Sequence, residues 1–208
     1  MREGGMTERL YGQDWEMSGT GIENTWEFGG GMGWYISPNF RADLTVDHHR
    51  NAKAHGTVNV PLSAIADPLQ ADHAGDWYSE FNVQSTTLLA NFYYDFGSRH
   101  DFNPYVGVGL GWAFNNTNAG KITNPCGCLS AIDGADETNF AWALMAGVSK
   151  DLGHGFNMDL GYRYLNMGGA HTGNIIDDAT GAEIPDTDPI VDDLTAHELR
   201  VGLRYDIF

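Results

Sequence analysis

The stretch FRADLTVDHH, residues 40–49, alternates apolar and polar side chains almost without interruption. Its two alternating sets are Phe40, Ala42, Leu44 and Val46 on one side and Arg41, Asp43, Thr45 and Asp47 on the other. Successive side chains point to opposite faces of a β-strand, so this segment has one apolar and one charged face. The fold depends on which of the two faces points into the protein.

The composition restricts the class of protein. A chain of 208 residues suits one domain. The 28 acidic and 11 basic residues give a formal net charge of -17, which argues against a nucleic-acid partner because phosphate binding needs a basic surface. No run approaches the ~20 apolar residues of a membrane-spanning helix. The start of the chain, MREGGMTERLYGQ, lacks the apolar core of a secretion signal.

The same period of two recurs in long segments that form hairpin pairs. These segments are TWEFGGGMGWYI (25–36), TTLLANFYYDF (86–96), NPYVGVGLGWAFN (103–115), NFAWALMAGVSK (139–150), FNMDLGYRYLNM (156–167) and AHELRVGLRYDIF (196–208). Short turns alternate with long polar connections, at about residues 49–82, 115–138 and 167–194. Short turns on one rim and long loops on the other are typical of a transmembrane β-barrel.

The chemistry of the two faces favours a barrel with its apolar face outward. The large aromatic residues of the apolar face are Trp26, Trp34, Phe92, Trp112, Phe114, Phe140, Trp142 and Tyr162. The opposite face carries Glu27, Arg41, Asp43, Asp47, Asp95, Asp159, Arg163, Glu198, Arg200, Arg204 and Asp206. Strands of about 10–12 residues, aromatic residues near strand ends and glycines on the polar face all fit a membrane barrel with a crowded lumen. A soluble barrel that buries the aromatic set remains the alternative.

The number of strands raises a question. Seven long strands are visible, whereas bacterial single-chain barrels normally have an even number. Either residues 1–23 supply an irregular first strand, or that strand and a signal peptide lie upstream; we expect the second. We therefore assign residues 1–23 to an N-terminal arm or first outer loop, and residues 24–208 to an all-β, antiparallel, up-and-down barrel of eight strands.

The segments NFYYDFGSRHDFNPYVGVGLGWAFN (91–115) and HELRVGLRYDIF (197–208) resemble the small outer-membrane β-barrel proteins of the opacity-protein and OmpA-like type, also called the porin family. The resemblance covers about residues 24–208. It implies an eight-stranded barrel in a Gram-negative outer membrane, inserted by the barrel-assembly machinery. It also implies a C-terminal sorting signal at Gly202, Tyr205 and Phe208, although Tyr205 and Phe208 have opposite parity.

The charged lumen is the first candidate functional site. Eight strands leave room only for side chains, and unpaired charges at that depth are unfavourable by several kcal/mol each. We therefore expect the seven acids and four arginines to pair into a polar network that seals the barrel. A narrow conducting path and acid–base catalysis by a carboxylate pair are the less favoured alternatives.

The predicted loops carry three further candidates. The acids Asp133, Asp136, Glu137, Asp177, Asp178, Glu183, Asp186, Asp188, Asp192 and Asp193 form a solvated rim that could bind divalent cations weakly, shared with lipopolysaccharide. The histidines are His48, His49, His55 and His73, and they lack the fixed spacing of a metal or catalytic site. Cys126 and Cys128 could form a small local disulfide, or remain free or pair between molecules.

The expected function is a non-enzymatic outer-membrane anchor, without metal or cofactor, that presents long acidic surface loops for structural or interaction roles. The alternatives are a small porin-like pore, a lipid-modifying enzyme and a soluble ligand-binding β-barrel. The expected partners are outer-membrane lipid, lipopolysaccharide and the assembly machinery. The surface ligand is not identified by any motif.

Overall fold

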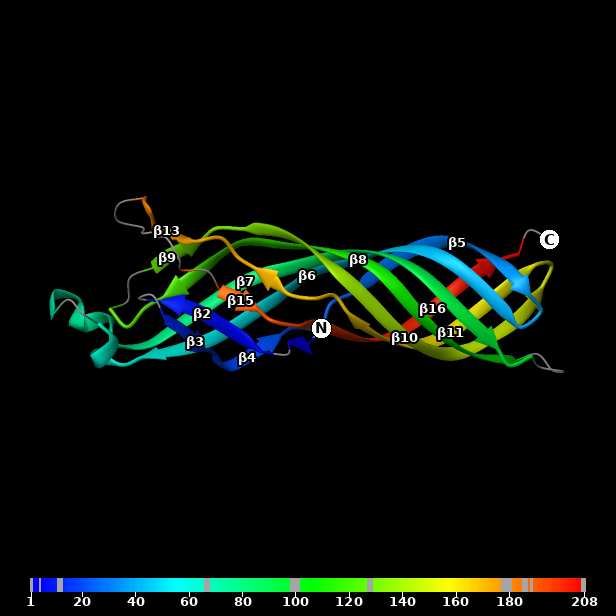
Figure 1. Ribbon diagram of the computed structural model, residues 1–208, viewed down its shortest axis with the longest axis horizontal. Helices are drawn as coiled ribbons and strands as arrows, with labels where there is room; N and C mark the ends of the chain where they lie inside the picture. Colours follow the sequence, from blue (N-terminus) through cyan, green and yellow to red (C-terminus); the bar gives the residue numbers. More distant parts are fainter. Residues whose placement is uncertain are drawn as a thin grey trace.

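The computed structural model describes residues 2–3, 5–10, 13–65, 68–97, 102–126, 129–176, 181–184, 187 and 189–206. The chain forms an elongated, curled antiparallel sheet whose long strands run along the length of the molecule (Figure 1). None of the helices in the described part is long or apolar enough to span a bilayer.

Seven long strands form the body of the sheet. They are β5 (Glu27–Ser37), β6 (Phe40–Val60), β7 (Gly75–Asp95), β8 (Phe102–Thr123), β10 (Ala135–Gly153), β11 (Phe156–Asn166) and β16 (Leu194–Tyr205). Each pairs antiparallel with the next along the chain, in the order β5-β6-β7-β8-β10-β11-β16. This arrangement is the up-and-down topology expected from the sequence.

The outer face of one half of this sheet is apolar. We call this band of exposed side chains the apolar belt. Its larger members are Trp26, Phe28, Met32, Trp34, Phe40, Leu44, Val46, Leu88, Phe92, Val106, Val108, Leu110, Trp112, Phe114, Phe140, Leu144, Leu160, Tyr162, Leu199, Val201 and Leu203. A continuous exposed apolar surface of this extent indicates a face that contacts lipid.

The long strands β6, β7, β8 and β10 continue beyond the belt into a second half, which we call the head. It consists of the described residues within 1–24, 50–84, 115–139 and 166–196. The expectation of long structureless connections at 49–82, 115–138 and 167–194 is therefore wrong in the described part of these segments. The remaining head elements are β1 (Arg2–Glu3), β2 (Met6–Leu10), β3 (Gln13–Glu16), β4 (Ser18–Ile22), η1 (Leu62–Ala64), η2 (Pro68–His73), β9 (Leu129–Ile132), β12 (Ala170–His171), β13 (Ile175–Ile176), β14 (Glu183–Ile184) and β15 (Pro189–Val191).

The head has a hydrophobic core inside the sheet. A separate sheet of order β12-β15-β2-β3 lies in the head. Its residues pack with inward side chains of the long strands in one buried cluster that includes Met6, Leu10, Ala54, Val58, Trp77, Phe81, Ile122, Met167, Ile175, Val191 and Leu194. The polarity of the sheet is thus reversed between the two halves: the belt is apolar outside and charged inside, and the head is polar outside and apolar inside.

A β-bulge in β6 marks this reversal. His49 pairs with Ser85 and Ala52 pairs with Val83, so three steps along β6 match two along β7. The extra residue changes which parity faces inward. Before the bulge, in the belt, the odd-numbered Asp47 and His49 are buried. After the bulge, in the head, Ala52 and the even-numbered residues that follow it are buried. Bulges commonly re-aim side chains in this way.

The edges of the sheet meet differently in the two halves. In the head, β1 pairs with the start of β16, Arg2 opposite Thr195, and β4 pairs with β6. In the belt, no described residue pairs through its backbone with the free edge of β5 or with the corresponding edge of β16. Side-chain contacts bridge these two edges, for example Arg200 on β16 and Glu27 on β5.

Candidate functional site: the charged interior

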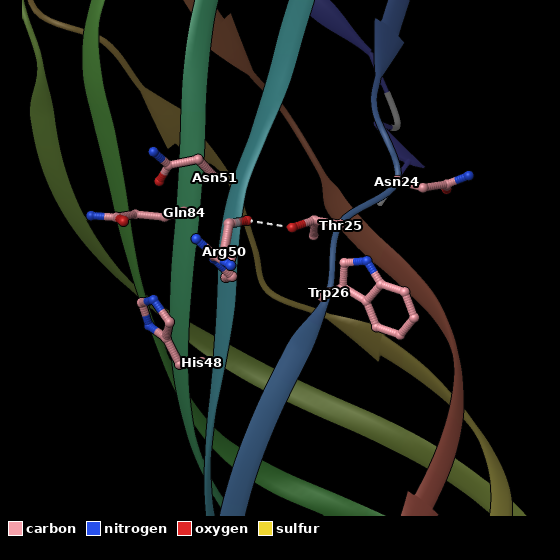
Figure 2. A pocket seen from close by; sticks show the side chains of 7 residues that line it. All are labelled: Asn24, Thr25, Trp26, His48, Arg50, Asn51 and Gln84. Atoms are coloured by element: carbon pink, nitrogen blue, oxygen red, sulfur yellow. Dashed lines mark hydrogen bonds between the residues drawn. The ribbon is translucent and has the colours of Figure 1, made fainter.

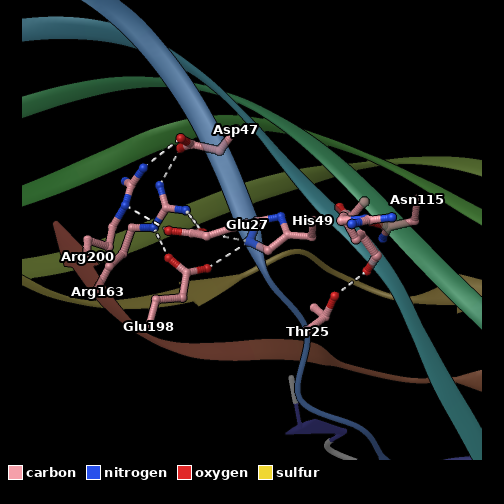
Figure 3. Close-up of polar contacts among 10 residues, drawn as sticks. Thr25, Glu27, Asp47, His49, Asn115, Arg163, Glu198 and Arg200 are labelled. Carbon is pink, nitrogen blue, oxygen red and sulfur yellow. Dashed lines mark hydrogen bonds and ion pairs between the residues drawn. The ribbon is translucent and has the colours of Figure 1, made fainter. Parts of the chain in front are cut away.

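Arg163 on β11 is the centre of a buried charge network at the end of the belt next to the head (Figure 3). Its Nη1 donates to Asp47 Oδ2 at 2.6 Å, its Nη2 donates to Glu27 Oε2 at 2.9 Å, and its Nε donates to Glu198 Oε2. The Arg163 side chain is fully buried. The planar guanidinium suits this role because its donors diverge in a fixed geometry. One arginine therefore joins strands β5, β6, β11 and β16.

Arg200 on β16 binds two of the same carboxylates through their other oxygens. Its Nε lies 2.9 Å from Glu27 Oε1, and its Nη2 donates to Asp47 Oδ1 at 2.6 Å. Both oxygens of Glu27 and of Asp47 are therefore held by guanidinium groups. Glu27 and Arg200 also bridge β5 and β16, which lack a backbone ladder between them.

His49 completes this interior cluster, which consists of Glu27, Asp47, His49, Arg163, Glu198 and Arg200. The His49 Nε2 lies 2.8 Å from Glu198 Oε1 and 3.0 Å from Glu27 Oε2. Ionised carboxylate oxygens only accept hydrogen bonds, so Nε2 carries the hydrogen. Three carboxylates face two guanidiniums, and a doubly protonated imidazole would make the formal charge of the cluster zero.

The ligand atoms of Glu27, His49 and Glu198 lie within 4.8 Å of one another, a spacing that could hold a metal ion. These atoms are already engaged with one another, however, and the His49 Nε2 carries a hydrogen. Both oxygens of Glu198 are bound, Oε1 to His49 and Oε2 to Arg163. A divalent cation would also have to sit beside two buried guanidiniums. The donor set therefore fits an ion-pair network and not a metal centre.

A second group of charges lies around Arg41, farther from the head and nearer the short turns. The Arg41 guanidinium carbon lies 4.3 Å from the Tyr93 ring centroid and 4.7 Å from the Tyr105 ring centroid. Its Nε lies 3.3 Å from Asp95 Oδ2, and its Nη1 lies 3.9 Å from Asp159 Oδ1. Cation–π contacts and ion pairs thus hold Arg41 across the lumen.

Glycines make room for these rings. A Cβ placed on Gly161 would lie 2.5 Å from the Tyr105 hydroxyl oxygen, and one on Gly147 would lie 2.6 Å from it. At such distances a side chain at either position would displace the Tyr105 ring. The glycines on the polar face therefore let a tyrosine ring cross the narrow lumen, the use that the sequence pattern suggested.

The end of the lumen next to the short turns has its own polar network. Arg204 Nη1 lies 3.5 Å from Asp159 Oδ2, and Arg204 Nε donates to Asp206 Oδ1 at 3.1 Å. Asp206 Oδ2 also accepts from Asn157 Nδ2 at 2.9 Å. Asp43, in the middle of the belt, accepts from Asn91 Nδ2 at 2.7 Å. The structure thus places every predicted interior charge on the inner face.

The predicted lipid-facing aromatics all lie on the outer face. Trp26 is 85% exposed and Phe140 is 60% exposed. Trp34, Phe92, Trp112, Phe114 and Tyr162 are exposed, and Trp142 is half-buried. The half-burial of Trp142 accompanies a tilted ring contact with Tyr164 at 5.4 Å between centroids. These positions place the aromatic set where lipid chains would contact it.

The sequence reasoning missed three interior residues. His49 was assigned to the start of a loop, although it lies on β6 and belongs to the interior cluster. Tyr93 and Tyr105 were not among the candidate site residues. The signal that could have found them is parity, since each shares its face with charged residues of the same or neighbouring strand.

The other predicted sites are dispersed. His48, His55 and His73 do not approach one another: His48 contacts Thr86, His55 contacts Tyr78 and His73 contacts Trp77. Among the rim acids, Asp136 accepts from Asn116 and Glu137 lies 3.4 Å from His171. Asp177, Asp178, Asp186, Asp188, Cys128 and Phe208 lie outside the described residues. The Cys126–Cys128 disulfide and the sorting signal remain predictions.

A curled antiparallel sheet with an apolar belt outside and paired charges inside defines a membrane β-barrel protein. The chain matches the family described as "Outer membrane protein beta-barrel domain" over residues 5–206 and belongs to it. Its place is therefore the bacterial outer membrane.

Several known proteins are similar to the chain. An uncharacterized protein of Brucella suis is 31% identical over 194 residues, covering 86% of this chain and 67% of the relative. A protein of Rickettsia felis, named as a candidate adhesin, is 29% identical over 181 residues, covering 85% of this chain and 72% of that protein. The crystal structure of Neisserial surface protein A matches with a TM-score of 0.32 at 15% identity, covering 86% of this chain and 95% of that chain.

Proposed function

We propose that the protein is a non-enzymatic outer-membrane anchor that presents an acidic, β-structured head for contact with a basic partner at the cell surface. The observation that carries this proposal is the combination of a lumen closed by paired charges with a head that has its own hydrophobic core. The first feature argues against transport, and the second argues for a rigid surface that other molecules can bind.

The interior supports the anchor and not the pore. Arg163 fills the lumen with three carboxylate partners, and Arg41 spans it between two tyrosine rings. Displacing either arginine would remove an ion-pair partner from buried carboxylates, which is unfavourable by several kcal/mol. An ion would have to break these contacts to pass.

The charge of the head supports a basic partner. Among the described residues of the head, 14 are acidic and five are basic. Such an excess attracts cationic surfaces over a distance of about 8 Å at physiological ionic strength. The name of the Rickettsia felis relative also concerns adhesion. An adhesin-like contact therefore agrees with both the electrostatics and the name of this relative.

The test combines two measurements on the purified protein. Planar-bilayer recording is expected to give no sustained unit conductance, and binding to immobilised polylysine is expected to weaken with salt. The variant E183Q/D192N/D193N, which neutralises three exposed head acids, should bind polylysine more weakly. The control E183D/D192E/D193E keeps the charge and should bind normally. Sustained conductance, or equal binding by both variants, would contradict the proposal.

A further inference from the structure

A hollow of about 460 Å³ opens on the outer face where the apolar belt meets the head (Figure 2). Its walls come from the segment that connects β4 to β5 and from the outward side chains of β6 and β7. The lining residues are Asn24, Thr25, Trp26, His48, Arg50, Asn51 and Gln84. The set contains an arginine, a histidine and three amides, and no carboxylate.

The β6 bulge creates this hollow. Arg50 and Asn51 are the two residues between His49 and Ala52, where the register shifts, and both side chains are exposed. The bulge therefore turns two consecutive side chains toward the same outer side. The connecting segment is tied to it, because Arg50 N donates to Trp26 O at 3.1 Å and Thr25 Oγ1 donates to Arg50 O at 2.7 Å. These two hydrogen bonds thus tie the connecting segment to the bulge.

Arg50 is an unpaired cation in an acidic protein. Within the described part of the chain, no carboxylate lies within ion-pair distance of its guanidinium, whereas Lys53, three residues further, pairs with Glu80 at 3.0 Å. An exposed guanidinium flanked by amide groups offers several hydrogen-bond donors in one place. This donor set matches the oxygens of a phosphate group.

The position of the hollow decides between the possible sources of that phosphate. Trp26 at its edge is 85% exposed, and the Phe28 ring lies 5.4 Å from the His48 ring. The apolar belt begins next to these rings, with Val46 and Leu44 exposed on β6. Tryptophan and arginine at the edge of an apolar belt lie at the depth of lipid headgroups.

We propose that this hollow binds the phosphate headgroup of an outer-leaflet lipid. Arg50 donates to the phosphate oxygens from its guanidinium, and the amides of Asn51 and Gln84 supply further donors on the same side (Figure 2). The Trp26 indole packs beside the uppermost part of the acyl chains. The site would fix the orientation of the barrel relative to the membrane surface.

Native mass spectrometry of the detergent-purified protein tests this assignment. Phosphatidic acid and phosphatidylcholine with identical chains serve as probes, because only the first carries a phosphate monoester. The wild type is expected to retain one phosphatidic acid in preference to phosphatidylcholine. Arg50→Gln should reduce its retention roughly tenfold, the loss of one charge-assisted interaction. Lys121→Gln removes the same charge elsewhere in the head and should retain the lipid.

Two further arms make the result decisive. Arg50→Lys keeps the positive charge but cannot form a bidentate pair with the phosphate, and we expect it to retain phosphatidic acid to an intermediate degree. Its folded state can be checked by the heat-dependent shift in gel migration. A large excess of inorganic phosphate should not release the lipid, because the apolar contacts remain. Equal retention by wild type and Arg50→Gln, or complete release by inorganic phosphate, would overturn the proposal.

Discussion

At the scale of single residues, Arg163 should be the side chain on which the belt depends most. Arg163→Met leaves Glu27, Asp47 and Glu198 without their shared partner inside the lumen. Removing one partner of a buried ion pair typically costs about 3–5 kcal/mol. We expect Arg163→Met to unfold at a urea concentration well below the wild-type midpoint, and Arg163→Lys to lower the midpoint less. If Arg163→Met unfolds at the wild-type midpoint, the network does not stabilise the barrel.

Glu8 in the head should make stability depend on pH. It is fully buried on β2, accepts one hydrogen bond from Ser79 Oγ at 2.9 Å, and burial raises its pKa from 4.5 to about 7. The folded head therefore binds the proton more tightly than the unfolded chain does. The contribution of Glu8 to the free energy of unfolding is therefore greatest below pH 4.5. It falls by roughly 3 kcal/mol as the pH rises to about 7.

Glu8→Gln tests that dependence, because glutamine keeps the shape and carries no charge. Between pH 4.5 and 7 the unfolding free energy of the variant should fall less steeply than that of the wild type. Glu183→Gln, an exposed head acid, serves as the control and should leave the slope unchanged. A wild-type slope in Glu8→Gln would show that another group titrates in this range.

At the scale of elements, the alternation of β6 beyond the bulge should be required for folding of the head. Inserting one alanine between Ala52 and Lys53 adds a residue that the native bulge does not absorb, so the side chains that follow would exchange faces. Lys53 would then point into the core, and Ala54 and Val58 would point into water. We expect the insertion variant to fail the heat-modifiable gel shift and to be cleaved by protease in the head. Deleting Asn51 removes the bulge residue itself, leaves Ala52 opposite Val83 and keeps the faces of the residues that follow, so this variant should fold.

The same element shows what the sequence could and could not predict. Alternation between Phe40 and His49 correctly predicted a strand with its charges inside. Beyond the bulge, NAKAHGTVNV also alternates, but with reversed parity and small inward residues such as Ala54 and Gly56. This weak pattern was interpreted as a loop. The pairing partners inside the lumen could not be predicted either, because which charges meet depends on how far the strands are staggered around the barrel.

At the scale of the whole molecule, the open edges of β5 and β16 have a defined geometry. β1 pairs with β16 through Arg2 opposite Thr195 and Glu3 opposite Leu194. Because the pairing is antiparallel, an extended segment placed before Arg2 would run along β16 toward Tyr205, between β16 and β5. Its backbone would hydrogen-bond to the N–H and C=O groups at the edges of β5 and β16, which lipid chains cannot do. The fold thus has a place for one more strand in the belt.

Joining about ten residues of alternating apolar and polar character to Arg2 tests this geometry. With the apolar side chains facing outward, the added strand should raise the temperature of the heat-dependent gel shift by at least about 5 °C, since a few kcal/mol correspond to such a shift in a chain of this size. The control carries the same residues displaced by one position, which turns the apolar side chains into the charged lumen. It should give no increase. Equal temperatures for the two fusions would mean that the strand does not enter between β5 and β16 in the register that β1 defines.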